Sequence, residues 1–246
     1  MVIYLNYLII LKSYFIAGLP VGSRYYGPPI LILVVRISYC IVSKSYSMKT
    51  FLHVGCGPKR KERTTAGFAD WNELRFDIDE SVQPDLVGTM TDMSSVSSKS
   101  VDAVFSSHNI EHLYPHEVPV ALSEFLRVLK PDGFAVITCP DLQAVCALVA
   151  EDKLTEPAYT SPAGPIAPLD ILYGHRPPMA RGNLDMAHRC GFTEKVLSGT
   201  LQSSGFKRVA SMKRGAPYFD LWALATKADL NEEELLSWAK NHFTPR

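Results

Sequence analysis

The stretch that decides the fold is FLHVGCGP, residues 51–58. A short apolar run leads directly into two glycines, Gly55 and Gly57, and such a turn after a first strand lets the backbone approach a bound nucleoside closely. About 20 residues further on, a second apolar segment, LRFDID at 74–79, ends in acidic residues that can accept hydrogen bonds from ribose hydroxyls. The two stretches together predict an adenosine-containing cofactor in an open α/β sheet.

Apolar runs alternate with amphipathic segments along the rest of the chain, which predicts βαβ units and a mostly parallel sheet. Strands are expected at 51–54, 74–78, 84–88, 101–106, 134–138, 206–212 and 219–226. Helices are expected at 118–129, 142–150, 193–204 and about 231–241, and residues 59–70 are compatible with a helix. Asp141, Thr193 and Asn231 are the expected N-caps. Residues 156–178 are rich in proline and glycine and predict a long loop or lid.

Composition narrows the range of partners. The 246 residues can form one large α/β domain, and 25 basic residues balance 25 acidic ones. This balance gives no electrostatic reason to expect nucleic acid or an anionic membrane as the main partner. The five cysteines are odd in number and include no C-x-x-C pair, which argues against a disulfide framework or a structural zinc site and favours a reducing, cytoplasmic location.

Residues 1–47 differ from the rest of the chain. Two apolar runs, 1–17 and 30–42, flank a Gly/Pro stretch, and each is shorter than the ~20 residues that span a bilayer. Three interpretations are open: a membrane-associated anchor, extra elements packed on the domain, or a mis-called start or disordered tail before a functional chain that begins at Met48. The third is favoured because Met48 leads straight into the first strand. We therefore expect an apolar extension at 1–47 and the functional domain at 48–246.

Four motifs occur in an order that resembles the class I S-adenosylmethionine-dependent methyltransferases, and within them the small type 11 group. These are VGCG at 54–57, FDID at 76–79, SHNIEHL at 107–113 and RVLKPDG at 127–133. A lone glycine motif is weak, whereas four motifs in order at the family's spacing are specific. The segments GFT at 191–193 and SGF at 204–206 also resemble the family's C-terminal part.

The resemblance implies a Rossmann-like α/β fold: a seven-stranded, mostly parallel sheet with helices on both faces and the last strand antiparallel. It implies S-adenosylmethionine as the cofactor, at the carboxyl ends of the first strands, under a lid at about 156–190. The glycine turn would pass under the methionine part, Asp77 would bind the ribose, and Ser107 and His108 would border the methionine end. The full set of implied cofactor-binding residues is Gly55, Cys56, Gly57, Asp77, Ile78, Asp92, Met93, Ser107 and His108.

Two departures from the family pattern bear on this site. A third glycine often follows the pair, whereas here Pro58, Lys59 and Arg60 follow. Asp79 competes with Asp77 for the ribose, because strand alternation places both on one face of the sheet. Asp77 is favoured because it lies nearer the expected strand end. Cys56 is interpreted as a small packing residue, since no thiolate-stabilising partner is evident.

Several histidines could carry chemistry. His108, His112 and His116 are spaced by four, as metal ligands on one helix face would be, but Pro115 breaks any helix there. His188 and Cys190 are too few to make a site by themselves, so no metal site is predicted. His108 and His188 are the candidates for a general base, although methyl transfer does not require one.

The predicted function is methyl transfer from S-adenosylmethionine to a small-molecule acceptor. Tyr173, His175, Arg176 and Arg181 lie in the lid region; they suggest an anionic or carboxylate-bearing acceptor, or else belong to a solvated surface loop. One alternative is a non-catalytic cofactor- or partner-binding module on the same fold. A further alternative is a nicotinamide-dependent oxidoreductase, which expects a third glycine where Arg60 stands. The acceptor and the oligomeric state stay open.

Overall fold

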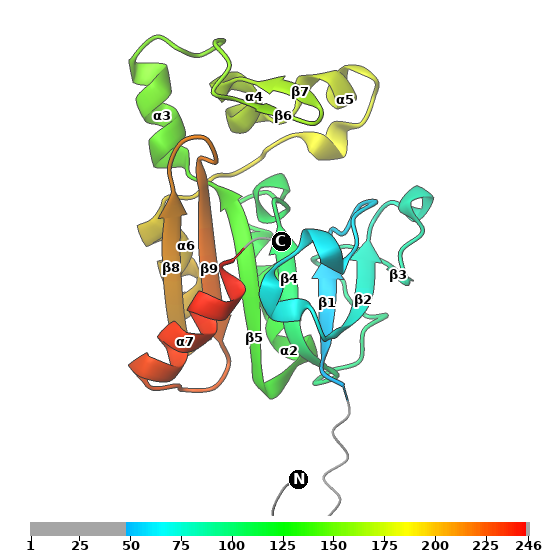
Figure 1. Ribbon diagram of the computed structural model, residues 1–246. Coiled ribbons are helices and arrows are strands. Elements are labelled where there is room, and N and C mark those ends of the chain that lie inside the picture. Colours follow the sequence, from blue (N-terminus) through cyan, green and yellow to red (C-terminus); the bar gives the residue numbers. More distant parts are fainter. Residues whose placement is uncertain (1–47, 245–246) are drawn as a thin grey trace, which may run out of the picture. The chain divides into compact units, whose positions relative to one another are not determined.

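The computed structural model describes residues 48–244, so the predictions for residues 1–47 lie outside the described part. Seven strands form one sheet in the order β3-β2-β1-β4-β5-β9-β8 (Figure 1). The strands are β1 (Thr50–Val54), β2 (Asn72–Asp77), β3 (Leu86–Val87), β4 (Val101–Ser107), β5 (Leu129–Pro140), β8 (Arg208–Arg214) and β9 (Asp220–Thr226). Neighbours from β3 to β5 are parallel, and β9 runs antiparallel to both β5 and β8. The predicted mostly parallel sheet with an antiparallel last strand is confirmed.

Six α-helices accompany the sheet among the described residues. They are α2 (Val118–Val128), α3 (Leu142–Ala150), α4 (Pro168–Tyr173), α5 (Arg176–Ala180), α6 (Glu194–Ser203) and α7 (Glu232–His242). Within residues 48–244, none of these helices combines the length and the apolar character that crossing a bilayer requires. Asp141, Thr193 and Asn231 each accept a hydrogen bond from the first turn of the helix that follows, as predicted.

Alternate residues of the central strands enter two separate cores. Leu52 of β1 belongs to a buried cluster that includes Leu122 of α2 and Leu197 of α6. Phe51, its neighbour in the same strand, belongs to a second cluster with Leu235 of α7. Because successive side chains of a strand point to opposite faces, these clusters place helices on both faces of the sheet, as expected.

Residues 59–70 do not form an α-helix. They contain two short 3₁₀ turns, η1 (Lys61–Arg63) and η2 (Ala66–Phe68). Phe68 of η2 is fully buried and stacks on Phe51 with ring centroids 4.3 Å apart. Gly67 lies so close to α7 that a β-carbon there would stand 2.5 Å from Cδ2 of His242. Docking on the sheet therefore overrides the helical preference of this segment.

The region predicted as a long loop is ordered. Residues 156–190, the lid, contain a two-stranded hairpin of β6 (Tyr159–Ser161) and β7 (Gly164–Ile166), then α4, α5 and a 3₁₀ turn, η5 (Leu184–Met186). Ile166 and Ile171 of the lid pack with Val145 of α3 and Phe219 in a third buried cluster. The lid lies over the carboxyl ends of β4 and β5 (Figure 1). Packing of its apolar side chains against α3 and Phe219 explains why this proline-rich stretch is structured.

Candidate active site

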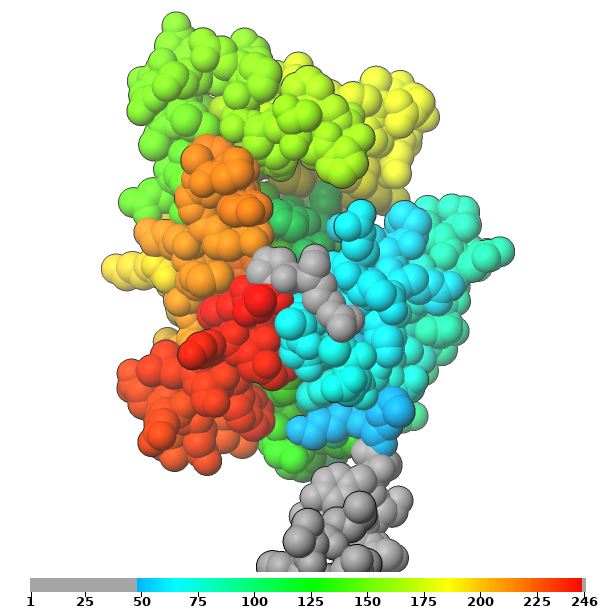
Figure 2. Space-filling view, in the orientation of Figure 1, coloured from blue at the N-terminus to red at the C-terminus, as the bar shows by residue number. Residues whose placement is uncertain are grey.

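A cavity of about 700 Å³, the larger cavity, lies at the carboxyl ends of β1 and β2. Its wall combines the glycine turn and the end of β2 with residues 88–90, 108–109 and 112–113 and with Asn183, Asp185, Met186 and Arg189 of the lid. The molecular surface is hollowed between the lid and the segment that carries β1 and β2 (Figure 2). Open α/β sheets bind their ligands at this edge.

The glycine turn has a backbone that other residues would strain. Gly55 has φ +61°, and a β-carbon there would stand 2.1 Å from Oδ1 of Asn109. The Asn109 amide is held in place because its Nδ2 donates to the carbonyls of Val54 at 2.9 Å and Ser107 at 3.1 Å. Gly57 has φ +52°, and no described atom lies within 4 Å of the position of its absent β-carbon. The second glycine therefore leaves its backbone open to the larger cavity.

Asp77 is the last residue of β2 and its carboxylate is joined to the glycine turn. Oδ2 accepts a hydrogen bond from the backbone N–H of Gly57 at 2.7 Å, and Oδ1 accepts one from the N–H of Asp79 at 3.0 Å. The exposed Asp79 instead caps η3 (Glu80–Val82), and its hydrogen bonds from Ser81 lower the pKa of its carboxyl. Both acids line the larger cavity, but only Asp77 is fixed to the turn.

The structure brings five of the nine sequence-predicted cofactor residues to the wall of the larger cavity: Gly55, Gly57, Asp77, Ile78 and His108. The other four, Cys56, Asp92, Met93 and Ser107, do not line it. Cys56 and Met93 are fully buried in the core, and burial raises the pKa of the Cys56 thiol to about 11. The Ser107 hydroxyl is 2.8 Å from that of Thr138.

Sequence reasoning missed Thr89, Met90 and Asn109 and the lid residues of the wall. Asn109 and Met90 each lie within two residues of a position that was chosen, so wider windows around the motifs would have found them. Asn183, Asp185 and Arg189 reach the larger cavity only because the lid folds back over the sheet. No local pattern in the sequence signals that return.

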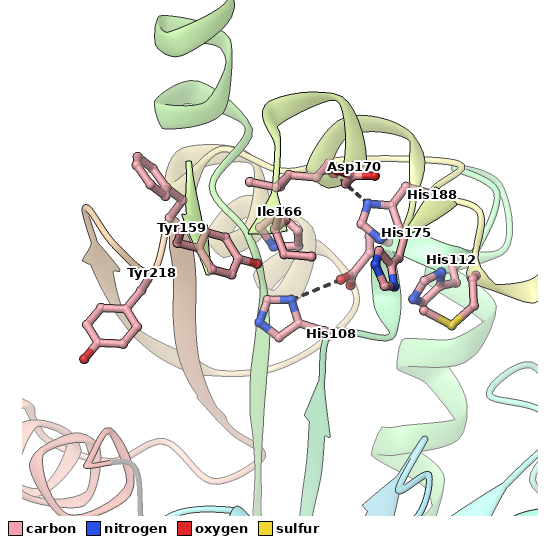
Figure 3. Close-up of a pocket in the computed structure, with 13 residues that line it drawn as sticks. His108, His112, Tyr159, Ile166, Asp170, His175, His188 and Tyr218 are labelled. Atoms are coloured by element: carbon pink, nitrogen blue, oxygen red, sulfur yellow. Dashed lines mark hydrogen bonds and ion pairs between the residues drawn. The ribbon is translucent and has the colours of Figure 1, made fainter. Parts of the chain in front are cut away.

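Figure 3 shows the lining of a second cavity of about 160 Å³, the smaller cavity. The two share His108, His112 and Met186 in their walls. Apart from these, the polar lining of the smaller cavity consists of Glu111, Tyr159, Asp170, His175, His188 and Tyr218. Two small ligands bound one in each cavity would therefore meet near His108.

The cationic residues of the lid contribute little to this lining. Of the four residues that suggested an anionic acceptor, only His175 lines the smaller cavity. Arg176 donates through Nε to Oδ1 of Asp170 at 2.7 Å, and Tyr173 is 63% exposed. The hydrogen bonds from Arg176 lower the pKa of the Asp170 carboxyl to about 2, against the opposing effect of burial. Arg176 thus neutralises a buried acid of the lid itself.

His108 stands where the two cavities meet. It follows β4 with φ +56°, and its backbone N–H donates to the carbonyl of Thr138 at 2.9 Å. Its ring nitrogens face two acids, with Nδ1 3.3 Å from Oε1 of Glu111 and Nε2 3.9 Å from Oδ2 of Asp220. The side chain is 46% exposed, but it lies in a recess. Partial desolvation lowers the pKa of His108, yet Asp220 and Glu111 more than offset this and raise it to about 9.

Glu111 is 1% exposed, and neither of its carboxylate oxygens has a hydrogen-bond partner among the described residues. Burial raises the pKa of this carboxyl, but the neighbouring His108 outweighs burial and lowers it. For His188, burial is the largest effect, and it lowers the pKa of the imidazole. No metal site was predicted from the sequence, yet the fold places Glu111, His112 and His188 together.

Part of the chain matches a known family. Residues 52–137 match the family model described as a methyltransferase domain. A search of curated proteins returned no match. A solved S-adenosylmethionine-dependent methyltransferase from Archaeoglobus fulgidus is 15% identical, with TM-score 0.45 and coverage of 73% of this chain and 86% of the other.

Another solved structure is the 1,6-didemethyltoxoflavin-N1-methyltransferase of Burkholderia thailandensis, with bound 1,6-didemethyltoxoflavin and S-adenosylhomocysteine. It is 16% identical, with TM-score 0.46 and coverage of 74% of this chain and 72% of the other. A methyltransferase from Methanosarcina mazei is 15% identical, with TM-score 0.49 and coverage of 73% and 92%.

The family match falls on the part of the chain that builds the site. Residues 52–137 include the glycine turn, the acid at the end of β2, and β4 with the segment that follows it. The open backbone at Gly57 and the fixed carboxylate of Asp77 suit a nucleoside-containing cofactor. Residues 52–137 therefore match a methyltransferase domain, and the sheet around them has the strand order and directions that the resemblance implies.

Proposed function

We propose that this enzyme transfers a methyl group from S-adenosylmethionine to a small-molecule acceptor, with the methyl donor in the larger cavity and the acceptor in the smaller one. The observation that carries the proposal is the adjacency of the two cavities, which share His108, His112 and Met186. A donor and an acceptor bound in this way would meet at the shared wall, as group transfer requires.

Residues of the larger cavity can be given roles in holding the donor. Asp77 would accept hydrogen bonds from the ribose hydroxyls, and the backbone around Gly57 would lie against the methionine part. Ile78 is 55% exposed and lines the cavity, so it would pack against the adenine. Thr89 and Met90 are better placed for the adenine than Asp92 and Met93, which do not line the cavity.

The bound cofactor supplies a methyl group on a sulfonium that is already reactive. The protein therefore needs to hold the acceptor in line with that methyl group and to exclude water. The lid suits the second task, because Tyr159, Ile166 and Ile171 from its hairpin and α4 cover the smaller cavity. His108 and His188 are the candidate catalytic groups, since both line this cavity and His108 also reaches the larger one.

The size and lining of the smaller cavity favour a compact acceptor. Its volume of about 160 Å³ lies below the range of ~300–1,000 Å³ that is typical of sites for drug-sized ligands. Tyr159, Phe219 and Ile166 supply apolar surface, and the histidines supply polar groups on one side of the cavity (Figure 3). We infer that the acceptor has a flat or apolar body and one polar end.

Calorimetric titration of the full chain tests this function with three ligands: S-adenosylmethionine, its demethylated product S-adenosylhomocysteine, and NAD. We expect binding of the first two and none of NAD. Binding of NAD alone would contradict the methyltransferase site. Turnover is then measured with a library of small acceptors. Binding of the cofactor without turnover on any acceptor would favour a non-catalytic module on the same fold.

A further inference from the structure

The smaller cavity contains three side chains whose atoms are typical metal ligands: Glu111, His112 and His188. One ligand atom from each lies within 4.8 Å of the others. Glu111 and His112 belong to η4 (Ile110–His112), the 3₁₀ turn shortly after β4, whereas His188 comes from the far end of the lid. His112 and His188 lie side by side, with ring centroids 4.9 Å apart (Figure 3).

Both imidazoles are held in the orientation that a metal ion needs. Nδ1 of His112 is 3.1 Å from the carbonyl of Ala187, and Nδ1 of His188 is 2.7 Å from the carbonyl of Ile171. A carbonyl oxygen can only accept, so each Nδ1 carries the hydrogen and each Nε2 keeps its lone pair. Metal-bound histidines are fixed in the same way, by a hydrogen bond from the second ring nitrogen to a carbonyl or carboxylate.

Glu111 gives a second and independent indication. A buried carboxylate whose oxygens accept no hydrogen bond is costly, because it has lost water without replacing it. Glu111 is 1% exposed, and Nδ1 of His108 lies 3.3 Å from its Oε1. Both oxygens lack a hydrogen-bond partner among the residues that the structure describes. A cation in the smaller cavity would satisfy them.

The backbone fastens the two halves of this cluster together. The N–H groups of Arg189 and Cys190 both donate to the carbonyl of Glu111, at 2.8 and 3.2 Å. Nη1 of Arg189 donates to the carbonyl of His112 at 2.6 Å. His188, the residue just before this contact, is therefore held next to η4 although it is distant in sequence. Such support is what keeps a set of ligands in place.

We propose that Glu111, His112 and His188 bind a divalent transition-metal ion in the smaller cavity. Two imidazoles and one carboxylate are the ligand set of many catalytic Zn²⁺ sites and of non-haem Fe²⁺ sites, and they leave coordination positions open. Zn–N bonds of about 2.0–2.1 Å place tetrahedral ligands roughly 3.4 Å apart. Small side-chain rotations would bring the three ligand atoms to that spacing.

The role of the ion rests on the proposed methyl transfer. An ion at this place would bind a hydroxyl or thiol of the acceptor through an open position and favour its deprotonated form. The proton would pass to solvent, and the acceptor atom would keep its electron pair for attack on the methyl carbon. The ion would then perform the task for which a general base is otherwise needed, close to the wall shared with the larger cavity.

Metal titrations of the full chain test the site without any knowledge of the acceptor. The protein is stripped with a chelator and titrated with Zn²⁺ by calorimetry and with Co²⁺ by visible absorption. We expect one ion per chain and Co²⁺ bands typical of a site with nitrogen ligands. His112→Ala and His188→Ala should each weaken zinc binding by more than about 100-fold, since a lost ligand should cost more than a lost supporting contact.

His116→Ala is the matched control, because His116 is an exposed histidine four residues after His112 and outside the cluster. It should bind zinc like the unmodified chain. Absence of the Co²⁺ bands in the unmodified chain would overturn the site, and this reading needs no variant to fold. Equal zinc affinity in the His188→Ala and His116→Ala proteins would also overturn it.

Titration of S-adenosylhomocysteine on the same samples separates this proposal from the proposed function. His188 does not line the larger cavity, so His188→Ala should keep its affinity for S-adenosylhomocysteine. Asp77→Ala should lose that affinity and still bind zinc. A chain that binds S-adenosylhomocysteine but no zinc contradicts the metal site alone. A chain that binds zinc but no S-adenosylhomocysteine contradicts the methyltransferase site alone.

Discussion

Replacing Gly55 by alanine should damage both the stability of the fold and the binding of the methyl donor. The backbone at Gly55 has φ +61°, a left-handed conformation that costs an alanine about 1–2 kcal/mol. The added methyl group would also stand 2.1 Å from Oδ1 of Asn109, so that side chain must move.

Moving Asn109 has a cost of its own. Its Nδ2 donates to the carbonyls of Val54 and Ser107, which join the end of β1 to the end of β4. Each lost hydrogen bond costs about 0.5–1.5 kcal/mol. Together with the backbone strain, Gly55→Ala should lower the free energy of unfolding by about 2–5 kcal/mol.

Urea unfolding followed by circular dichroism measures this change, with two glycine variants as controls. Gly57→Ala shares the positive φ but meets no described atom within 4 Å, so it should cost only about 1–2 kcal/mol. Gly199→Ala lies in α6 on the surface and should stabilise by about 0.5–1 kcal/mol. A loss for Gly55→Ala no larger than that for Gly57→Ala would refute the role given to the Asn109 contact.

Three further variants test other parts of the molecule. The folded pKa of Asp170 is about 2, below its ordinary 3.8, so the stabilisation by Arg176 should be present above about pH 4 and disappear as the pH falls toward 2. The free energy of unfolding should fall by about 1–2 kcal/mol over this pH range, a value that allows for solvent screening at the exposed Arg176. Asp170→Asn should not show this fall, and equal pH profiles of the two proteins would contradict the prediction. Phe68→Ala removes a fully buried aromatic ring and should lower the free energy of unfolding in denaturant titrations by about 3–5 kcal/mol. A loss under about 1 kcal/mol would mean that Phe68 does not anchor η2 to the sheet. Asn231→Ala removes the cap of α7 and should cost about 1 kcal/mol; an unchanged unfolding midpoint would show that the cap does not contribute.

The architecture could be predicted from the sequence because its signals are local. The apolar strand before Gly55, the amphipathic helix at 118–129 and the cap residues each depend on a few neighbouring side chains. The segment at 59–70 was mispredicted for the opposite reason. Its conformation depends on Phe68 and Gly67 docking against the sheet and α7, which no local pattern reveals.

The site was predictable only where one motif builds it. The pairing of Asp77 with the glycine turn follows from their spacing, and the structure makes it a direct hydrogen bond to Gly57. The smaller cavity could not be predicted, because its wall joins η4 to the lid across a long stretch of chain. No local pattern brings His112 to His188, yet the fold places their ring centroids 4.9 Å apart.

The central claim is that Asp77, joined to the glycine turn, holds the methyl donor in the larger cavity. Calorimetric titration of S-adenosylhomocysteine into Asp77→Ala and Asp79→Ala tests it most directly. Loss of hydrogen bonds to a charged group costs about 1.5–3 kcal/mol, so Asp77→Ala should bind about 10- to 150-fold more weakly. Asp79→Ala should change the affinity much less. Undiminished affinity in Asp77→Ala, or a larger loss in Asp79→Ala, would contradict the account.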